Sequence, residues 1–403
     1  MSTLRLTTAG ESHGPAEVCV LGGVPAGLAL TTEDIDAELA RRQRGYGRGG
    51  RMTIETDRCR LLSGVRHGVT LGSPIAIMVE NHDHANWVES MSPAPLPEGT
   101  ARPASLTIPR PGHADLTGMA KYGHEDMRNI LERASARETV SRVAGGAVCK
   151  RLLAELGVTT KGRVTSIGDV TSASDVDLAR PGSIDWQAVE ASPVGCDDAA
   201  AADKMCAAID QAKAAGESLG GVFEVWCWGV CPGLGSYARM EDRLDGRLLG
   251  ALGSIPAIKG AEIGYGFAAA GLPGSQVHDA IILGDGRAGS PAVSRATNHA
   301  GGLEGGMSNG LPIVVRAAMK PIPTLTTPLT SVDLSSMEPV AAHYERSDVS
   351  AVPAARVVAE AMVAYVVAAA YVEKFGGDYL ADLIGSVAAY ENRLEDRGLW
   401  RRS

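Results

Sequence analysis

The sequence predicts a mixed α/β fold of the α+β kind. Short apolar runs with strand character, such as residues 74–81 and 311–320, alternate with segments whose apolar residues recur at helical spacing. Aromatic residues make up only 4% of the 403 residues, whereas 49 residues are glycine. The core is therefore expected to consist of Ala, Val, Leu and Ile, with many tight turns between elements.

Strands are expected in the first quarter of the chain, around a turn with the sequence GESHG at residues 10–14, and again between about residues 160 and 235, where they alternate with an Ala-rich helix. Apolar residues bounded by glycine, proline and polar residues define each of them. A proline-rich loop, residues 90–105, precedes a strand end that runs into the motif RPGHAD. The expected strands cover residues 2–10, 17–25, 52–65, 74–81 and 311–320.

The helices are identified by the signals at their ends. Thr31 or Thr32 is expected to cap the first helix, and Ser135 with Glu138 fits a capping box at the start of the clearest one. Gly157 follows the last turn of that helix. The expected helices cover residues 30–43, 133–157, 198–216, 351–375 and 378–396.

Several features favour a cytoplasmic protein with no membrane segment. The apolar run 361–372 has the length of a buried helix, is too short to span a membrane, and is flanked by Glu360 and Glu373. The first ten residues contain no apolar segment of the secretory kind. Seven scattered cysteines without a CxxC spacing indicate reduced thiols, and argue against a disulfide framework or a zinc site.

The net charge of the chain and the spacing of its histidines limit the kinds of partner and ligand that it is expected to bind. A net charge of -9 argues against a nucleic-acid partner, so clusters of arginine stand out against this background. His82 and His84 in NHDH could suggest metal ligands, but no third group of ligands lies nearby in the sequence. We therefore expect no metal.

The segment GYGRGG, residues 45–50, fits the pattern GxGxxG of dinucleotide-binding proteins. That fingerprint requires a strand before it and a helix after it, whereas here a helix precedes and a strand follows. We therefore do not expect a Rossmann site. Arg42, Arg48 and Arg51 suit a carboxylate or phosphate ligand, or equally a solvated helix end where Arg41 and Arg42 complement the helix dipole.

A second group of arginines lies at the start of the helix 133–157. Arg137 falls in its first turn, where a cation opposes the positive end of the helix dipole. Because a helix N-terminus binds anions, we interpret Arg133, Ser135 and Arg137 as a cradle for a phosphate or carboxylate. The alternative is a plain cap with surface arginines.

Three side chains are candidates for proton transfer. His13 in GESHG and His113 in RPGHAD each follow a glycine, and each has an acidic or arginine neighbour within three residues. Histidine gives and takes protons near neutral pH, although a single histidine is more often structural. Arg346 and Asp348 in ERSD form either a surface pair or an anion clamp beside a base.

The candidate groups span nearly the whole chain, and they include the glycine-rich loop 301–310 and Lys320. If they form one site, the chain is one domain, residues 1–403, or two halves that meet at one cleft. The residues therefore indicate an enzyme that binds a small, multiply anionic ligand and transfers protons with two histidines and an acid.

Seven segments, in the same order, resemble the chorismate synthase family: GESHGPAEVCVLGGVPAG, RRQRGYGRGGRM, RPGHAD, RASARETVSRVAGGA, GGLEGGMSNG, AAMKPIPT and ERSDVSAVPAARVVAEAM. The resemblance covers residues 3–375 and leaves a C-terminal helix and tail, 376–403. It implies the 1,4-anti elimination of phosphate from 5-enolpyruvylshikimate 3-phosphate (EPSP), which gives chorismate in the last step of the shikimate pathway. It also implies a requirement for reduced FMN without net redox change.

The resemblance further implies the architecture and the roles of residues. Helices would lie between two antiparallel sheets, in a β-α-β sandwich that assembles as a homotetramer. His13 would lie by the flavin N1–C2=O edge, where its glycines let the backbone approach flavin and substrate. His113 would protonate the departing phosphate, and Asp348 would deprotonate flavin N5.

The binding residues follow from the same resemblance. The substrate would be bound by Ser12, Arg42, Arg48, Arg110, Arg137 and Arg346. The flavin would contact Arg133, Ala134, Ser135, Pro256, Ala257, Gly305, Lys320, Pro321, Ile322, Pro323, Thr324 and Arg346. A nicotinamide nucleotide, NADPH as indirect reductant, is placed in this family at Arg42 and Arg48. An external flavin reductase or other reductant would then be the remaining partner.

The sequence departs from the family pattern at three positions. Pro256 replaces the usual Asn or Gln at a flavin-contact position, and proline offers neither a side-chain amide nor a backbone N–H. Tyr265 and Glu217 each stand where Asp is usual. Two alternatives stay open: an NAD(P)H-consuming flavin oxidoreductase that acts on an anionic substrate, and a non-catalytic binding protein for an anionic metabolite.

Overall fold

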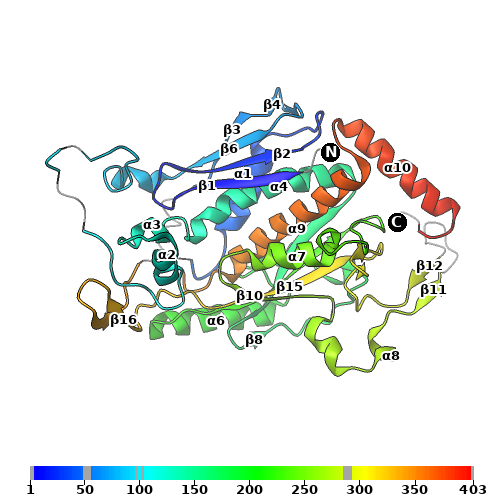
Figure 1. The fold of residues 1–403 in the computed structure, drawn as a ribbon. Coiled ribbons are helices and arrows are strands. Elements are labelled where there is room, and N and C mark those ends of the chain that lie inside the picture. The colour runs from blue at the N-terminus through cyan, green and yellow to red at the C-terminus, as the bar shows by residue number, and fades with distance from the viewer. Residues whose placement is uncertain are drawn as a thin grey trace.

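The computed structural model describes residues 4–48, 56–96, 98–100, 104–284, 293–345 and 347–400. Its mixed α/β architecture, with several antiparallel sheets, confirms the predicted fold class. The two larger sheets lie on opposite sides of a group of long helices, as Figure 1 shows. Two expected site residues, Arg51 and Arg346, lie outside the described residues.

The first sheet has four antiparallel strands in the order β1-β2-β6-β3. Along β2, buried side chains alternate with more exposed ones, so that Glu17, Cys19 and Leu21 share the inner face. The strands are β1 (Arg5–Gly10), β2 (Ala16–Gly22), β6 (Ile75–Glu80) and β3 (Cys59–Ser63).

The second sheet has five antiparallel strands in the order β10-β15-β9-β7-β8. Its central strand β9 carries Phe223 and Trp226, which are fully buried although aromatic residues are scarce in the sequence. The strands are β10 (Ile258–Ile263), β15 (Ile313–Met319), β9 (Gly221–Trp228), β7 (Thr159–Ile167) and β8 (Val170–Thr171).

Four helices fill the space between the sheets. Helix α4 packs on the first sheet, α9 packs on the second, and the two helices contact each other. Gly146 makes this contact close, because a Cβ there would lie 2.3 Å from the Cβ of Ala361. The four helices are α1 (Thr32–Gln43), α4 (Thr139–Glu155), α7 (Leu244–Gly253) and α9 (Val352–Phe375).

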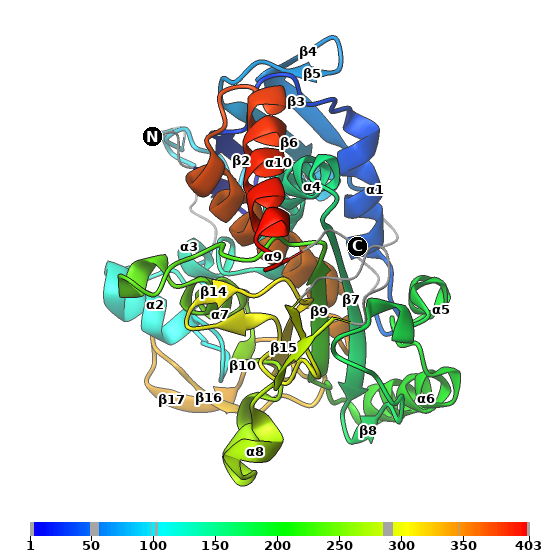
Figure 2. The same cartoon turned by 90° about the vertical axis from the view of Figure 1, so that its right-hand side faces the viewer.

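The remaining elements surround this core. Helix α10 lies outside α9, as Figure 2 shows. The outer helices are α2 (Asp115–Tyr122), α3 (Arg128–Leu131), α5 (Trp186–Ala191), α6 (Ala199–Ala215), α8 (Gly274–Val277) and α10 (Leu380–Asp396). Short strands pair as β4 (Val65–Arg66) with β5 (Val69–Thr70), β11 (Ile281–Leu283) with β12 (Val293–Arg295), β13 (Leu303–Glu304) with β14 (Met307–Ser308), and β16 (Thr330–Asp333) with β17 (Glu338–Ala341).

The predicted capping box at Ser135 is wrong in its detail. Ser135 caps a 3₁₀ turn, Ala136–Glu138, by accepting a hydrogen bond from the backbone N–H of Arg137, and α4 begins only at Thr139. The Glu138 carboxylate pairs with Arg142 instead of reaching back to the Ser135 backbone. An arginine one turn further along the helix therefore competes for the carboxylate that a capping box requires.

Helix α9 is apolar and long enough to cross a membrane, but 94% of its most apolar window is buried inside the protein. Its centre contains Glu360, which is fully buried. The Glu360 carboxylate accepts hydrogen bonds from Arg41 at 2.7 and 2.9 Å and from Lys150 at 2.9 Å. Helices α1, α4 and α9 thus share a buried ion pair network, which identifies α9 as a core helix.

Candidate active site

His13 lies in the turn between β1 and β2, and its ring is held from several sides. Ring atom Nδ1 lies 3.0 Å from both carboxylate oxygens of Glu132, and the backbone N–H donates to Glu132 Oε2 at 2.9 Å. The ring stacks on Trp87 with 4.1 Å between the centroids. Asp83 lies 3.9 Å from ring atom Nε2. These contacts fix the ring against the segment that precedes α4.

The glycine at the start of this turn serves the packing of the protein itself. Gly10 has a φ of 127°, and a Cβ there would lie 2.6 Å from Ala16 O and from a carboxylate oxygen of Glu17. Close approach of the backbone to Glu17 therefore explains Gly10 without a ligand.

His113 belongs to a compact group within the motif RPGHAD. Its Nδ1 lies 2.5 Å from Asp115 Oδ1, and Asp115 is fully buried. Arg110 donates to Asp115 through its backbone N–H and its guanidinium at 2.9–3.1 Å, and also to Glu345 at 3.3 Å. Burial would raise the pKa of Asp115, but the hydrogen bonds from His113 and Arg110 hold that pKa well below its usual range.

Arg42 and Arg137 meet at one buried carboxylate, Asp57. Arg137 Nη1 donates to Asp57 Oδ1 at 2.6 Å, and Arg42 Nη1 lies 3.4 Å from Asp57 Oδ2. Arg137 also donates to Asn81 at 2.8 Å, and Arg42 to Thr139 at 3.0 Å. Burial beside a second guanidinium lowers the pKa of Arg42 to about 10.

Arg48 and Asp348 form an ion pair of 3.0 Å between Nη1 and Oδ2. The backbone supports this contact, since the N–H of Val349 donates to Gly47 O at 2.8 Å. The charge of Arg48 lowers the pKa of Arg42 and the charge of Asp348 raises it. The ion pair is therefore close enough to the cluster around Asp57 to interact with it electrostatically. The loop 45–48 and the segment after residue 346 therefore lie side by side.

Two expected flavin-contact residues, Arg133 and Lys320, touch the loops that carry His13 and His113. Arg133 donates to Thr8 Oγ1 at 2.7 Å and to Gly10 O at 3.3 Å, and its side chain is 41% exposed. Lys320 connects two other segments, because its backbone N–H donates to Ala257 O at 3.0 Å and its Nζ donates to Gly112 O. The turn at Ala257 thus lies beside the loop that carries His113.

Three other expected flavin residues, Ile322, Thr324 and Gly305, lie in or beside segments that make further hydrogen bonds. Ser218 Oγ donates to Ile322 O at 2.6 Å, and Ser347 Oγ donates to Thr324 O at 3.3 Å. Gly305 lies in the turn between β13 and β14, where the neighbouring Gly306 O accepts from the first residue of α7. Gly305 thus lies near the N-terminal end of α7, whereas Ala257 follows the C-terminal end of that helix.

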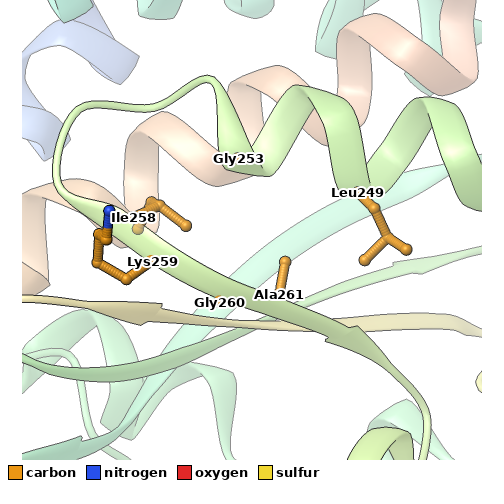
Figure 3. A pocket seen from close by; sticks show the side chains of 6 residues that line it. All are labelled: Leu249, Gly253, Ile258, Lys259, Gly260 and Ala261. Carbon is orange, nitrogen blue, oxygen red and sulfur yellow. The ribbon is translucent and has the colours of Figure 1, made fainter.

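A small hollow of about 360 Å³ opens between α7 and β10. As Figure 3 shows, Leu249 projects from the helix and Ala261 from the strand. The hollow adjoins Ala257, because Ile258, which lines it, is the next residue. The lining residues are Leu249, Gly253, Ile258, Lys259, Gly260 and Ala261.

Glu17 is a buried acid that the sequence motifs did not single out. It lies on the inner face of β2 with no exposed surface, and among the described residues its Oε1 has no hydrogen-bond partner. Arg133 Nη1 lies 3.5 Å from its Oε2. Burial raises the pKa of Glu17 to about 7, against the opposing charges of Arg133 and Arg137.

The variant Glu17→Gln is expected to change how stability depends on pH. A raised pKa means that the folded protein holds this proton more tightly than the unfolded chain does, so stability from this group is full below pH 4.5 and is lost as pH rises through about 7. Glutamine cannot ionise. When the pH is raised from 5 to 8.5, the free energy of unfolding of the variant should therefore increase relative to that of the wild type by about 3 kcal/mol. Urea unfolding at both pH values measures this gain, with exposed Glu89→Gln as the control; an equal difference at both pH values would contradict it.

The three departures from the family pattern differ in their surroundings. Tyr265 stacks on His299 with 4.0 Å between ring centroids, and its backbone N–H donates to His299 O at 2.9 Å. Glu217 is exposed, and Pro256 is half-buried in the turn before β10. Tyr265 therefore packs on its neighbouring loop, while Pro256 alone lies at an expected flavin contact.

Sequence reasoning missed the carboxylates that hold the predicted side chains in place. Asp115 and Glu132 were within reach, since one follows His113 by two residues and the other precedes Arg133. Asp57 gave no local signal, because its partners Arg42 and Arg137 lie 15 and 80 residues away. Long-range pairing of this kind is invisible to motif spacing.

The geometry defines an enzyme rather than a structural protein. Imidazole rings fixed by carboxylates, close to buried guanidinium groups, suit proton transfer on an anionic substrate. The family model described as chorismate synthase matches residues 4–372. The chain belongs to the chorismate synthase family, whose members are lyases.

Individual relatives agree with this assignment over almost the full length. A chorismate synthase of Bacillus cytotoxicus is 54% identical over 381 residues, which are 93% of this chain and 95% of that protein. One of Rubrobacter xylanophilus is 54% identical over 388 residues, 96% of each chain. A crystal structure of chorismate synthase matches with a TM-score of 0.79 and 42% identity, covering 98% of this chain and 99% of that one.

Proposed function

We propose that this protein converts EPSP to chorismate and phosphate by a 1,4-anti elimination that depends on reduced FMN and involves no net redox change. The observation that carries the proposal is the meeting of distant motifs in one region. Arg42 and Arg137 share Asp57, and Arg48 pairs with Asp348. The RPGHAD loop joins them, since Arg110 contacts Glu345.

The arginine cluster supplies positive charge for a substrate with two carboxylates and a phosphate. Substrate binding is assigned to Ser12, Arg42, Arg48, Arg110, Arg137 and Arg346. Arg42 uses three of its five N–H donors on Thr139, Asp57 and Ala136 O, so it retains donors for a substrate anion. Within the described residues, Asp57 thus helps to orient Arg42 without using all of its donors.

The residues present fit an anionic flavin nucleotide. Arg133 and Lys320 are partly exposed cations that flank the cluster, and Ala257 has a φ of 68°, which shapes the backbone turn before β10. FMN would be held by Arg133, Ala134, Ser135, Pro256, Ala257, Gly305, Lys320, Pro321, Ile322, Pro323, Thr324 and Arg346. When bound and reduced, it supplies transient electron donation and a hydrogen acceptor at N5.

The protein's own groups would then move the protons. His113 would donate a proton to the departing phosphate, and the Asp348 carboxylate would accept the proton of flavin N5. The His13 ring, fixed by Glu132, would be the group that offsets the negative charge of the reduced flavin at its N1–C2=O edge. Each role requires a side chain held in one orientation, which the buried carboxylates provide.

We further propose one domain over residues 1–403, a β-α-β sandwich that assembles as a homotetramer in the cytoplasm. Reduced flavin would come from an external reductase, with NADPH as the indirect reductant and Arg42 and Arg48 as its site. The family resemblance supports each of these assignments.

Anaerobic phosphate release from EPSP tests the proposed function. The protein is mixed with EPSP and either dithionite-reduced or oxidised FMN, and phosphate and flavin oxidation are measured together. Release only with reduced FMN, and without flavin oxidation per turnover, is the expected result. Release coupled to flavin oxidation would indicate an oxidoreductase instead, and EPSP binding without release would indicate a binding protein.

A further inference from the structure

Both histidines of the site are held by a carboxylate at the same ring atom, although they come from unrelated segments. His113 Nδ1 lies 2.5 Å from Asp115, and His13 Nδ1 lies 3.0 Å from Glu132. Asp115 is fully buried, and Glu132 is 2% exposed. Neither carboxylate has an assigned role in the reaction.

We propose that Asp115 and Glu132 are the positioning residues of His113 and His13. Each carboxylate accepts a hydrogen bond from the Nδ1–H of its histidine, so that Nε2 is the ring atom that transfers the proton in the reaction. The inference rests on the proposed function, and it deepens that function by assigning the proton-transferring atom of each ring. Asp115 and Glu132 act through the histidines, without contact to substrate or flavin.

Asp115 determines the tautomer of His113. Its hydrogen bonds keep its pKa well below the usual range despite burial, so the group is a carboxylate and can only accept. Arg110 Nη2 lies 3.0 Å from the same ring nitrogen and 3.4 Å from Nε2, but a guanidinium can only donate. The Nδ1 proton must therefore be on the ring and must point to Asp115, because a bare nitrogen at 2.5 Å would repel the carboxylate.

Arg110 holds the Asp115 carboxylate in place beside the His113 ring. Its Nε and Nη2 donate to the two oxygens of Asp115 at 2.9 and 3.1 Å, and its backbone N–H donates at 3.1 Å. The carboxylate therefore cannot rotate away from the ring. His113 receives a single orientation from a residue that lies two positions further along the chain.

Glu132 fixes both the ring and the backbone of His13. One carboxylate accepts from the ring and from the backbone N–H, while the backbone carbonyl of Glu132 accepts from the N–H of Ser12 at 3.0 Å. Arg128 holds the carboxylate from the opposite side at 2.9 Å. Burial would raise the pKa of Glu132, but the His13 hydrogen bonds and Arg128 lower it, so this group also accepts.

The stack on Trp87 removes the remaining freedom of the His13 ring. Trp87 lies 4.1 Å away with 27° between the planes, and the Arg128 guanidinium lies 4.8 Å over the Trp87 ring. The ring plane is set by Trp87, and the rotation within that plane is set by Glu132. Together they set the direction of Nε2, which lies 3.9 Å from Asp83 Oδ2.

Variants that remove charge at constant shape test this inference. In Asp115→Asn and Glu132→Gln, we expect kcat for EPSP to fall roughly 10–100-fold, the range for losing the partner that orients a histidine ligand, while KM stays within about twofold. The alkaline limb of the kcat–pH profile should move to lower pH, because the protonated ring loses its carboxylate. Asp203→Asn and Glu155→Gln, exposed carboxylates on α6 and α4, are the matched controls.

Charge-retaining variants separate positioning from simple structural support. Asp115→Glu and Glu132→Asp are expected to keep the wild-type pH profile even where kcat falls. Nitrogen-15 NMR of histidine-labelled protein without substrate should show the Nδ1–H tautomer in the wild type and its loss in Asp115→Asn. Wild-type kcat and pH profile in Asp115→Asn and Glu132→Gln, or equal losses in charge-removing and charge-retaining variants, would overturn the inference.

The NMR result also distinguishes a failure of the proposed function from a failure of the positioning roles. A wild type that shows the Nδ1–H tautomer but releases no phosphate from EPSP would refute the proposed function alone. A wild type that releases phosphate but shows unchanged rings in both charge-removing variants would refute the positioning roles alone.

Discussion

Replacing His113 with alanine is expected to lower EPSP turnover by roughly 10²–10⁴, the range for loss of a general acid–base group. We propose that this imidazole protonates the departing phosphate, and Arg110, whose Nη2 lies 3.0 Å from the ring, cannot substitute because a guanidinium stays protonated. His13→Ala should cause a loss of the same order. Single-turnover phosphate release with reduced FMN measures both effects.

The exposed His124→Ala is the matched control and should retain full turnover. Wild-type turnover in both His13→Ala and His113→Ala would remove these residues from the mechanism. The double variant separates an enzyme from a binding protein, because its EPSP affinity should persist while turnover is lost. An equal loss of affinity and turnover would mean that the histidines bind substrate rather than move protons.

Much of the fold follows from local sequence signals. Helix α6 was expected at 198–216 and is found at Ala199–Ala215, because Asp198 caps its start and Gly216 ends it in a left-handed conformation. Strand β6 follows the apolar run that predicted it, since that run is buried on alternate positions between β2 and β3. Caps and periodicity act within one turn of the chain, so one sequence suffices to find them.

The interior of the site could not be predicted in the same way. One of two open interpretations placed Arg41 at a solvated helix end, where it would complement the helix dipole. In the structure its guanidinium is bound by Glu38, Glu190 and Glu360 from three helices. The family resemblance drew attention to the histidines and arginines, yet it did not indicate which carboxylates hold them. Such partners are determined by how helices and sheets pack, and a spacing of 319 residues leaves no local trace.

The largest loss of stability is expected from Glu360→Ala. The carboxylate is fully buried and accepts hydrogen bonds from Arg41, Lys150 and the backbone N–H of Gly162. Its removal leaves cations and a backbone donor without their partner between the two sheets, which should cost about 3–5 kcal/mol of the free energy of unfolding. Urea unfolding followed by circular dichroism at pH 7.5 measures the cost.

The double variant Lys150→Met with Glu360→Met shows whether this loss arises from unbalanced charge or from lost packing. Methionine fills the volume, and Arg41 keeps Glu38 and Glu190 as partners, so the double variant should recover part of the stability. Burial would raise the pKa of Glu360, but the positive charges of Lys150 and Arg41 lower it. The stability of the wild type should therefore fall as the pH is lowered to the usual pKa of a glutamate and below it. If Glu360→Ala unfolds at the wild-type urea concentration, the network does not hold α1, α4 and α9 together. Apolar contacts such as that between Gly146 and Ala361 would then be sufficient to do so.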